Sequence, residues 1–166
     1  MAGLTSEQLQ VPTDHLVEIH LPFLLLTDAQ RQMQTTEHGV LDNFDLGSPN
    51  VPRAVEALAR YIGDVLDQPF NSVIWKRGGS THTSFSESYD PRATTNNYAG
   101  KIARLSLMDR PLLSYGGDGV AEVTRQMHPG LVVSLSAAQP HCINYPRSAK
   151  YRHSMLLGYD VTKFAN

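Results

Sequence analysis

The fold assignment rests on the stretch Met127-His128-Pro129-Gly130-Leu131-Val132-Val133-Ser134-Leu135-Ser136 and on the residues that follow it. The Pro-Gly pair predicts a tight turn, and the β-branched run after it predicts a buried strand. His141 comes after a short linker, and a second turn separates it from a strand that opens with Arg152. Both side chains can face one cavity, where imidazole can bind a metal and guanidinium can bind a carboxylate.

The bulk composition indicates an ordinary globular protein. The chain has 166 residues, which suits a single domain, and we expect an N-terminal part (1–69) of one strand and helices before a β-rich core (70–166). The net charge of −2 provides no broad basic field, which argues against strong nonspecific nucleic-acid binding. Five basic residues crowd one third of the sequence and predict either a local basic groove or scattered solvated charges: Lys76, Arg77, Arg92, Lys101 and Arg104.

Cysteine content and apolar runs bear on the compartment. Cys142 is the single cysteine, which excludes an intrachain disulfide and a multi-cysteine zinc site, and fits a reducing compartment. The longest apolar run, residues 21–26, contains Pro22 and is far too short to span a bilayer. No basic segment precedes an apolar one at the N-terminus, as a signal peptide would require. We therefore expect an intracellular, cytoplasmic protein without a membrane partner.

The N-terminal part mixes strand and helix signals. Residues 15–26 predict a strand, with Pro22 indicating an edge or a bulge. Thr27 or Asp28 can cap a short helix that continues to about residue 37. Residues 42–49 predict a polar loop.

Residues 51–67 carry the clearest helix signal, with Asn50 as the expected N-cap and Pro52 in the first turn. Apolar residues recur there at helical spacing and form one stripe: Val51, Val55, Leu58, Ile62, Val65 and Leu66. This stripe predicts a helix that packs on a sheet.

From residue 70 onward the pattern changes to short β-rich segments separated by turn signals. The predicted strands are 72–76, 101–108, 112–115, 120–127, 131–136, 141–145 and 151–159. The Gly116-Gly117-Asp118-Gly119 tract predicts a hairpin, and residues 80–97 predict a long functional loop. Helices followed by many strands favour an α+β domain with a C-terminal sandwich or barrel.

Four segments follow one another in the order of a known superfamily: Phe70-Asn71-Ser72-Val73-Ile74, Ile102-Ala103-Arg104-Leu105-Ser106-Leu107, His128-Pro129-Gly130-Leu131-Val132-Val133 and Arg152-His153-Ser154-Met155-Leu156-Leu157. In this order the chain resembles the 2-oxoglutarate/Fe(II)-dependent dioxygenases, and among them the AlkB-like branch. The resemblance covers residues 70–159. It implies a jelly-roll-like double-stranded β-helix with N-terminal supporting helices.

The resemblance also implies Fe(II) and 2-oxoglutarate as cofactors. His82 and His141 would bind the iron, and Arg152 would bind the distal carboxylate of 2-oxoglutarate. The first-ligand motif of the family is His-x-Asp or His-x-Glu, whereas this chain reads His82-Thr83-Ser84. Glu87 or Asp90 would then be the third ligand. Gly158 stands where the AlkB-like branch has a second arginine.

Three states of such a site follow from the departure at Ser84. Glu87 or Asp90 completes an unusual triad; or the carboxylate position stays empty, which resembles non-haem halogenases; or the domain has lost iron and acts as a binding module. An intact site implies oxidative dealkylation or hydroxylation, with an alkylated nucleobase as the substrate that the AlkB-like resemblance suggests. The implied partners are a small-molecule co-substrate and, as a further candidate, nucleic acid.

Cys142 offers a different hypothesis, a cysteine hydrolase. Because adjacent residues of a strand point to opposite faces, His141 cannot readily be its base, and His82, His128 or His153 would have to serve. A structural cysteine is the alternative. The aromatic residues Trp75 and Tyr98 either stack on a flat substrate or are ordinary sheet residues.

Overall fold

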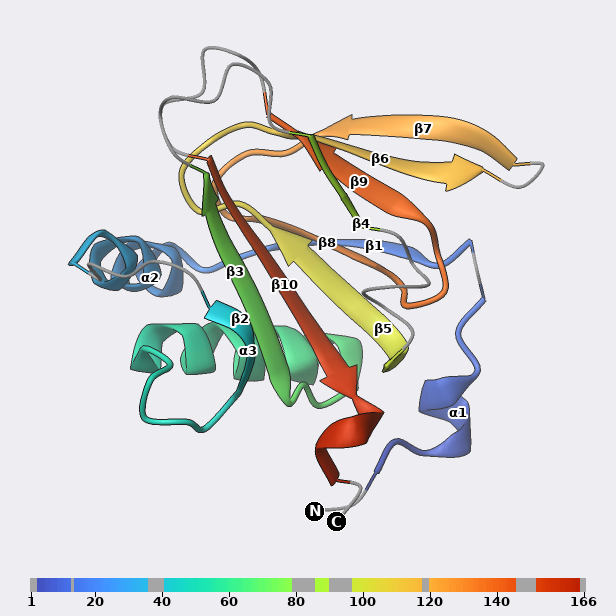
Figure 1. Cartoon of the computed structure of the whole chain (residues 1–166), viewed down its shortest axis with the longest axis horizontal. Helices are drawn as coiled ribbons and strands as arrows, with labels where there is room; N and C mark the ends of the chain where they lie inside the picture. Colours follow the sequence, from blue (N-terminus) through green and yellow to red (C-terminus); the bar gives the residue numbers. More distant parts are fainter. Residues whose placement is uncertain are drawn as a thin grey trace.

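The structure is a computed structural model that describes residues 3–12, 14–35, 41–78, 86–89, 97–117, 120–145 and 152–164. Its strands form a six-stranded and a four-stranded sheet, which lie one above the other in Figure 1. The strands are β1 (Leu16–His20), β2 (Leu41–Asp45), β3 (Ser72–Gly78), β4 (Ser86–Tyr89), β5 (Tyr98–Leu105), β6 (Leu112–Gly117), β7 (Val120–Gln126), β8 (Leu131–Ser136), β9 (His141–Asn144) and β10 (Arg152–Asp160). The helices are α1 (Ser6–Leu9), α2 (Phe23–Thr35), α3 (Arg53–Leu66) and the 3-10 helix η1 (Val161–Phe164).

The sheet topology confirms the predicted fold class. The six-stranded sheet has the order β1-β8-β5-β10-β3-β2 and the four-stranded sheet the order β4-β9-β6-β7. All pairings are antiparallel. From β3 to β10 the chain crosses back and forth between the two sheets, with only the β6–β7 hairpin staying in one. This is the double-stranded β-helix of an α+β domain, and the predicted hairpin at residue 116 is the β6–β7 connection.

The helix α3 covers the outer face of the six-stranded sheet, as predicted. Its inward residues are fully or nearly fully buried: Ala54, Val55, Leu58, Ala59, Ile62, Gly63 and Leu66. A buried Leu or Ile side chain contributes about 1.5–3 kcal/mol, so this stripe anchors the helix. Two details differ from the prediction. Val65 is half exposed, and the N-cap is Pro52 rather than Asn50, because the first helical carbonyl acceptors belong to Pro52.

Three segments differ from the structure predicted for them. The strand ends at His20, and residues 23–26 open α2, because the carbonyl of Pro22 accepts the first helical hydrogen bond from Leu26 (3.1 Å). Part of the expected polar loop is the strand β2, whose extended backbone is stabilised by hydrogen bonds to β3. The expected loop 80–97 contains β4, which β9 holds in place. The position of β1 at a sheet edge agrees with the prediction.

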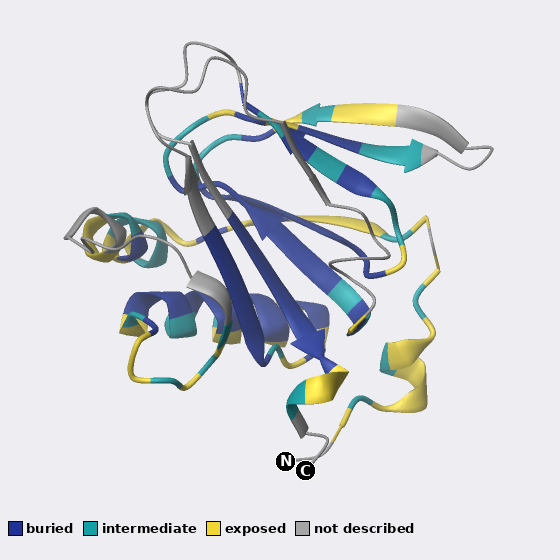
Figure 2. Ribbon diagram, in the orientation of Figure 1, coloured by how far each residue is buried: buried dark blue, intermediate teal, exposed yellow. Residues whose placement is uncertain are grey.

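Two apolar clusters lie on the two sides of the six-stranded sheet. The first joins that sheet to α2 and α3 and includes Val73, Trp75, Ala103, Leu105 and Leu157. The second lies between the sheets and includes Ile74, Ile102, Leu113, Leu131, Val133, Ile143 and Leu156. Figure 2 shows the central strands and the inner side of α3 buried. We call the space between the sheets the barrel interior.

An ion pair joins the edge strand β1 to the edge strand β7 of the other sheet. The Arg125 side chain donates to both carboxylate oxygens of Glu18, at 2.6 and 3.1 Å. Nearby, the rings of His20 and His128 stack with their centroids 5.8 Å apart. These contacts hold the two sheets together along one side.

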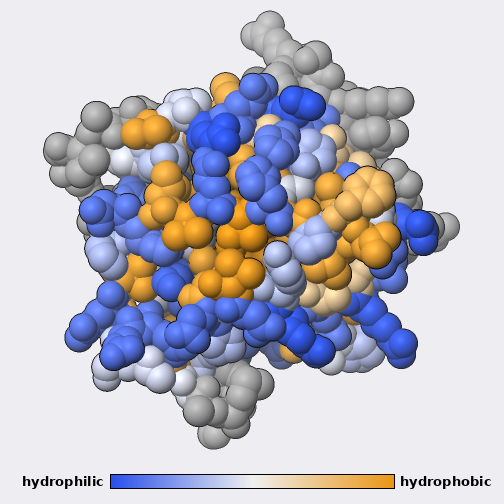
Figure 3. All heavy atoms as spheres, turned by 180° about the vertical axis from the view of Figure 1, so that it is seen from behind, coloured by the Kyte–Doolittle hydropathy of each residue, from blue (hydrophilic) through white to orange (hydrophobic). Residues whose placement is uncertain are grey.

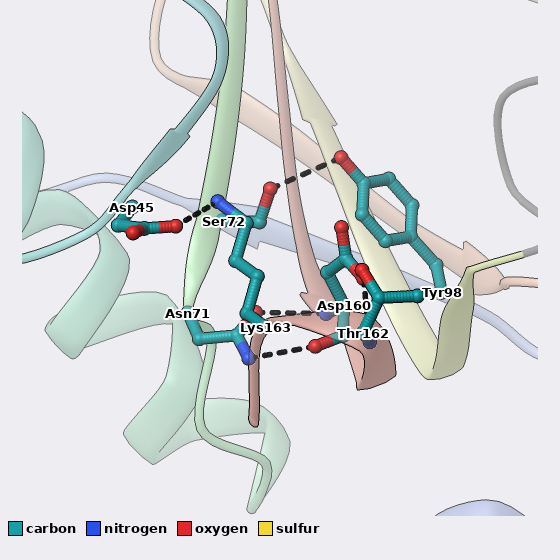
Figure 4. Close-up of polar contacts among 7 residues, drawn as sticks. All are labelled: Asp45, Asn71, Ser72, Tyr98, Asp160, Thr162 and Lys163. Atoms are coloured by element: carbon teal, nitrogen blue, oxygen red, sulfur yellow. Dashed lines mark hydrogen bonds and ion pairs between the residues drawn. The ribbon is translucent and has the colours of Figure 1, made fainter. Parts of the chain in front are cut away.

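A polar network closes one end of the fold beneath β10 (Figure 4). Its members are Asp45, Asn71, Ser72, Tyr98, Asp160, Thr162 and Lys163. The Asn71 amide donates to the carbonyl of Asp160 and accepts from its N–H. The buried carboxylate of Asp160 accepts hydrogen bonds from the N–H and the hydroxyl of Thr162. Asp160 thereby caps the start of η1. The network is structural, and Tyr98, bonded to Ser72, belongs to it.

The surface carries apolar side chains as well. Figure 3 shows an apolar area at the centre of the face seen from behind, bordered by hydrophilic residues. The most exposed apolar side chains of the described residues are Phe23 (75%) and Leu24 (73%), at the start of α2. Among the described helices, none has the length and apolar character needed to cross a membrane.

Candidate functional site

The barrel interior contains a buried arginine, Arg104, for which the sequence predicts a basic groove or a solvated charge. Residues of β5 alternate: Ile102 belongs to the interior cluster, whereas Ala103 and Leu105 face the helices. Arg104 therefore shares the face of Ile102. Its side chain is fully buried (0% exposed), and its partners across the ladder are Val133 of β8 and Leu156 of β10.

His141 faces the same interior from the opposite sheet. It opens β9, shares one face of that strand with the interior residue Ile143 and is 5% exposed. Its Nδ1 lies 3.1 Å from the carbonyl oxygen of Gln139. A carbonyl can only accept, so Nδ1 carries the proton in this contact and the lone pair lies on Nε2. That tautomer is the one that binds a metal through Nε2.

The charge state of His141 follows from its surroundings. Burial, and to a smaller extent the positive charge of Arg104, lower its pKa to about 4, against a smaller opposing effect of the Gln139 hydrogen bond. The imidazole is therefore neutral at pH 7. Arg104 is thus close enough to His141 for its charge to act on the imidazole.

Of the other predicted site residues, two lie in described strands and two lie outside the described residues. Arg152 is the first residue of β10 and pairs with Gly78 of β3. Glu87 lies in β4, which is the neighbour of β9, and pairs with Ile143. His82 and Asp90 lie outside the described residues. The structure thus places the backbone of Glu87 next to the strand of His141.

The donors that are described fit an iron site only in part. His141 is a neutral, buried imidazole with its lone pair on Nε2, which suits Fe(II). In the described part of the chain, no group of three His, Cys, Asp or Glu side chains could hold a metal ion.

The cysteine hypothesis finds no support in the geometry of β9. Cys142 alternates with His141 and Ile143, so it lies on the face opposite the barrel interior. It is half-buried, and the amide of Asn144 contacts its sulfur at 3.7 Å. His141 is therefore not placed to act as its base.

The aromatic and basic residues also have ordinary places. Trp75 is 1% exposed and packs in the cluster beneath the helices, so it is a core residue. Lys101 donates to the carbonyl of Leu66 (2.7 Å), which ties β5 to α3. A basic groove that uses Arg104 is wrong, because Arg104 is buried. The sequence signal for the burial of Arg104 is its position as the one charged residue in the otherwise apolar segment Ile102-Ala103-Arg104-Leu105.

A separate groove lies on the outer side of the fold. It has a volume of about 510 Å³ and is lined by residues of α1, α3 and the adjoining loops, among them Gln8, Glu56, Arg60, Asp64 and Phe70. None of the predicted site residues lines it. The barrel interior is the better candidate, since His141 and Arg104 are buried on strand faces that belong to it.

Comparison with known proteins gives the same fold. No family model and no curated protein sequence matches the chain. Among solved structures, the α-ketoglutarate-dependent non-heme epimerase SnoN of nogalamycin biosynthesis is similar, with a TM-score of 0.61 and 16% identity over 87% of this chain and 77% of that one. A 2OG-Fe(II) oxygenase family oxidoreductase from Burkholderia pseudomallei has a TM-score of 0.59 at 14% identity, covering 87% and 88%. A prolyl-4-hydroxylase from Pseudomonas putida has a TM-score of 0.57 at 14% identity, covering 87% of each chain.

Proposed function

We propose that this protein is a 2-oxoglutarate- and Fe(II)-dependent oxygenase that carries out oxidative dealkylation or hydroxylation. One observation carries the proposal: a buried, neutral histidine opens β9 and faces the interior of a double-stranded β-helix. The similar solved structures support it, because all three are named for 2-oxoglutarate chemistry or for hydroxylation.

In this proposal each residue has a stated role. His141 binds iron through Nε2, together with His82 and either Glu87 or Asp90. Arg152 binds the distal carboxylate of 2-oxoglutarate. The bound iron and co-substrate supply the oxidising chemistry. The chain's own contribution at His141 is to fix the tautomer, because the Nδ1–H group donates to the carbonyl of Gln139, and to keep water away from the ring.

The substrate proposal rests on the sequence resemblance. The order of the segments around β3, β5, β8 and β10 favours the AlkB-like branch and therefore an alkylated nucleobase. We further propose that residues 1–166 act as one domain in the cytoplasm. Incubation with methylated single-stranded oligonucleotides, followed by mass spectrometry of the nucleosides, tests the substrate class. Unchanged methylation by an iron-competent protein would exclude it.

The test of the activity itself is an anaerobic titration with Fe(II), with and without 2-oxoglutarate, that follows the weak visible charge-transfer absorption. We expect a band that needs both components and is lost in His141→Ala and Arg152→Ala. Cys142→Ser is the matched control, because Cys142 adjoins His141 but lies on the other face of β9. Absence of the band in the wild-type protein would refute the proposal.

A binding module without iron is the second candidate. It is favoured by Ser84, which stands where the family's motif has a carboxylate. Such a module predicts that Fe(II) leaves the melting temperature unchanged. Stabilisation by Fe(II) that depends on His141 would exclude it.

A further inference from the structure

The groove on the outer side of the fold is a second concave site, separate from the barrel interior. Its volume of about 510 Å³ lies in the range of small-molecule pockets. Two of its lining residues, Leu46 and Phe70, pack against the apolar cluster that joins the six-stranded sheet to the helices. The groove is therefore on the helix side of that sheet, whereas the barrel interior lies on its other side (Figure 1).

Side-chain hydrogen bonds hold the walls of the groove in place. The Gly47 N–H donates to Oε1 of Glu56 (3.0 Å), which fixes the loop after β2 to α3. The side-chain amide of Gln8 in α1 donates to the carbonyl of Asp67 at the end of α3 (2.7 Å). All four residues line the groove, so contacts within the fold set its shape before a ligand binds.

The charges of the described lining residues are mostly negative. They comprise the carboxylates of Glu56, Asp64 and Asp67 and the guanidinium of Arg60. Arg60 lies one helical turn from both Glu56 and Asp64, yet no ion pair joins it to either. In the part of the chain that the structure describes, no hydrogen bond or ion pair engages the carboxylates of Asp64 and Asp67. The groove therefore favours a cation over an anion.

Apolar side chains lie beside these carboxylates. Phe70 is only partly buried, and Leu46 and Ala59 line the same groove. Carboxylates next to an apolar surface suit an organic cation, because its charged end meets the carboxylates while its carbon body covers the apolar surface. The nearby ammonium of Lys101 donates to the carbonyl of Leu66 and does not line the groove.

We propose that this groove binds a small organic cation, a primary amine that carries an apolar group. The ammonium donates to the carboxylates of Asp64 and Asp67, and the apolar group packs on Phe70. This goes beyond the proposed function, since the groove is separate from the barrel interior and its ligand needs no iron. A neutral or anionic compound of the same shape binds more weakly, because it leaves the carboxylates without an opposite charge.

The test measures binding of phenethylamine to the metal-free protein, in buffer with EDTA, by calorimetry and by NMR shifts of the backbone amides. The matched neutral and anionic compounds are 2-phenylethanol and 3-phenylpropionate. We expect phenethylamine to bind about tenfold more tightly than either, with an affinity that falls as the salt concentration rises. The amide signals of Gly47, Gly63 and Phe70 should shift. The amide signal of His141, in the barrel interior, should not.

Four variants separate ligand binding from a structural role. Asp64→Asn and Asp67→Gly each remove one carboxylate and should weaken phenethylamine binding about three- to tenfold. Asp67 has a φ of 52°, a conformation that favours glycine, so Asp67→Gly should fold at least as well as the wild type. Arg60→Gln removes the opposing positive charge and should strengthen binding, which a loss of structure would not do. Asp28→Asn removes an exposed carboxylate of α2 outside the groove and should bind like the wild type.

Absence of phenethylamine binding at concentrations up to about 10 mM would overturn the proposal. Equal binding of the three phenyl compounds would also overturn it, since the groove would then be apolar without selecting a cation. The same holds if Asp64→Asn and Asp67→Gly bind like the wild type, or if Asp28→Asn weakens binding as much as they do. None of these outcomes depends on Fe(II), so the proposed oxygenase activity is tested separately by its own charge-transfer band.

Discussion

The neutral state of the buried His141 predicts a specific pH dependence of stability. In the folded protein its pKa is lowered to about 4 from the ordinary 6.5, mainly by burial. Between these two values the unfolded chain binds a proton at this position and the folded chain does not. The free energy of unfolding therefore falls as the pH falls from 6.5 to about 4, and the contribution of His141 is complete only above pH 6.5.

The size of the effect follows from the difference between the two pKa values. Each pH unit over which the proton is bound in one state alone is worth about 1.4 kcal/mol. The contribution of His141 to the free energy of unfolding should thus fall by roughly 3 kcal/mol between pH 7 and pH 4. That is a large part of the 5–15 kcal/mol typical of a domain (on the order of a third).

The assay is urea unfolding of the metal-free protein at several values of pH from 4 to 7.5. The wild type is compared with His141→Gln, whose amide can still donate to the carbonyl of Gln139. Titrations of all other groups cancel in the difference between the two proteins, so the difference isolates His141. Cys142→Ser retains His141 and should keep the full pH dependence.

Proton NMR of the imidazole provides an independent measurement. The ring signal of His141 should remain that of a neutral imidazole down to about pH 4. A His141 signal that titrates near 6.5 would refute the reasoning, as would a stability difference between the wild type and His141→Gln that does not vary with pH. Either result would mean that the ring reaches water or has an anionic partner.

Three further predictions concern the scaffold. Leu58→Ala in α3 should lower the free energy of unfolding by about 2–5 kcal/mol, measured by urea denaturation, because Leu58 is fully buried; a change below about 1 kcal/mol would contradict the packing. Gln68→Leu should cost about 2–4 kcal/mol, since the Gln68 amide bonds both the N–H and the carbonyl of Lys101 at 2.7 Å; amide exchange of Lys101 should accelerate. The hydrogen bonds from Arg125 lower the pKa of Glu18, so the ionised carboxylate stabilises the fold above pH 4.5 and this stabilisation is lost as the pH falls through the lowered pKa. Glu18→Gln should remove this pH-dependent part of the free energy of unfolding. A loss that does not become smaller in high salt would argue against an ion pair.

Local chemistry was sufficient to predict much of the fold. The strand β8 follows the Pro129-Gly130 turn as predicted, and α3 buries the expected stripe, because turn residues and apolar periodicity act over a few neighbouring positions. His141 also lies at the predicted strand start. The sequence therefore determined the order of the elements and one end of the candidate site.

The tertiary structure decided what depends on partners distant in sequence. The strands β2 and β4 lack a strong strand pattern of their own and are regular because β3 and β9 pair with them. Arg104 looks like a surface charge in the sequence, yet its strand lies between β8 and β10 at the centre of a sheet. Burial is a property of the neighbours on both sides and of the opposite sheet, so the composition of one strand cannot reveal it. That placement, rather than any motif, brings a guanidinium and a neutral imidazole to the two walls of one interior.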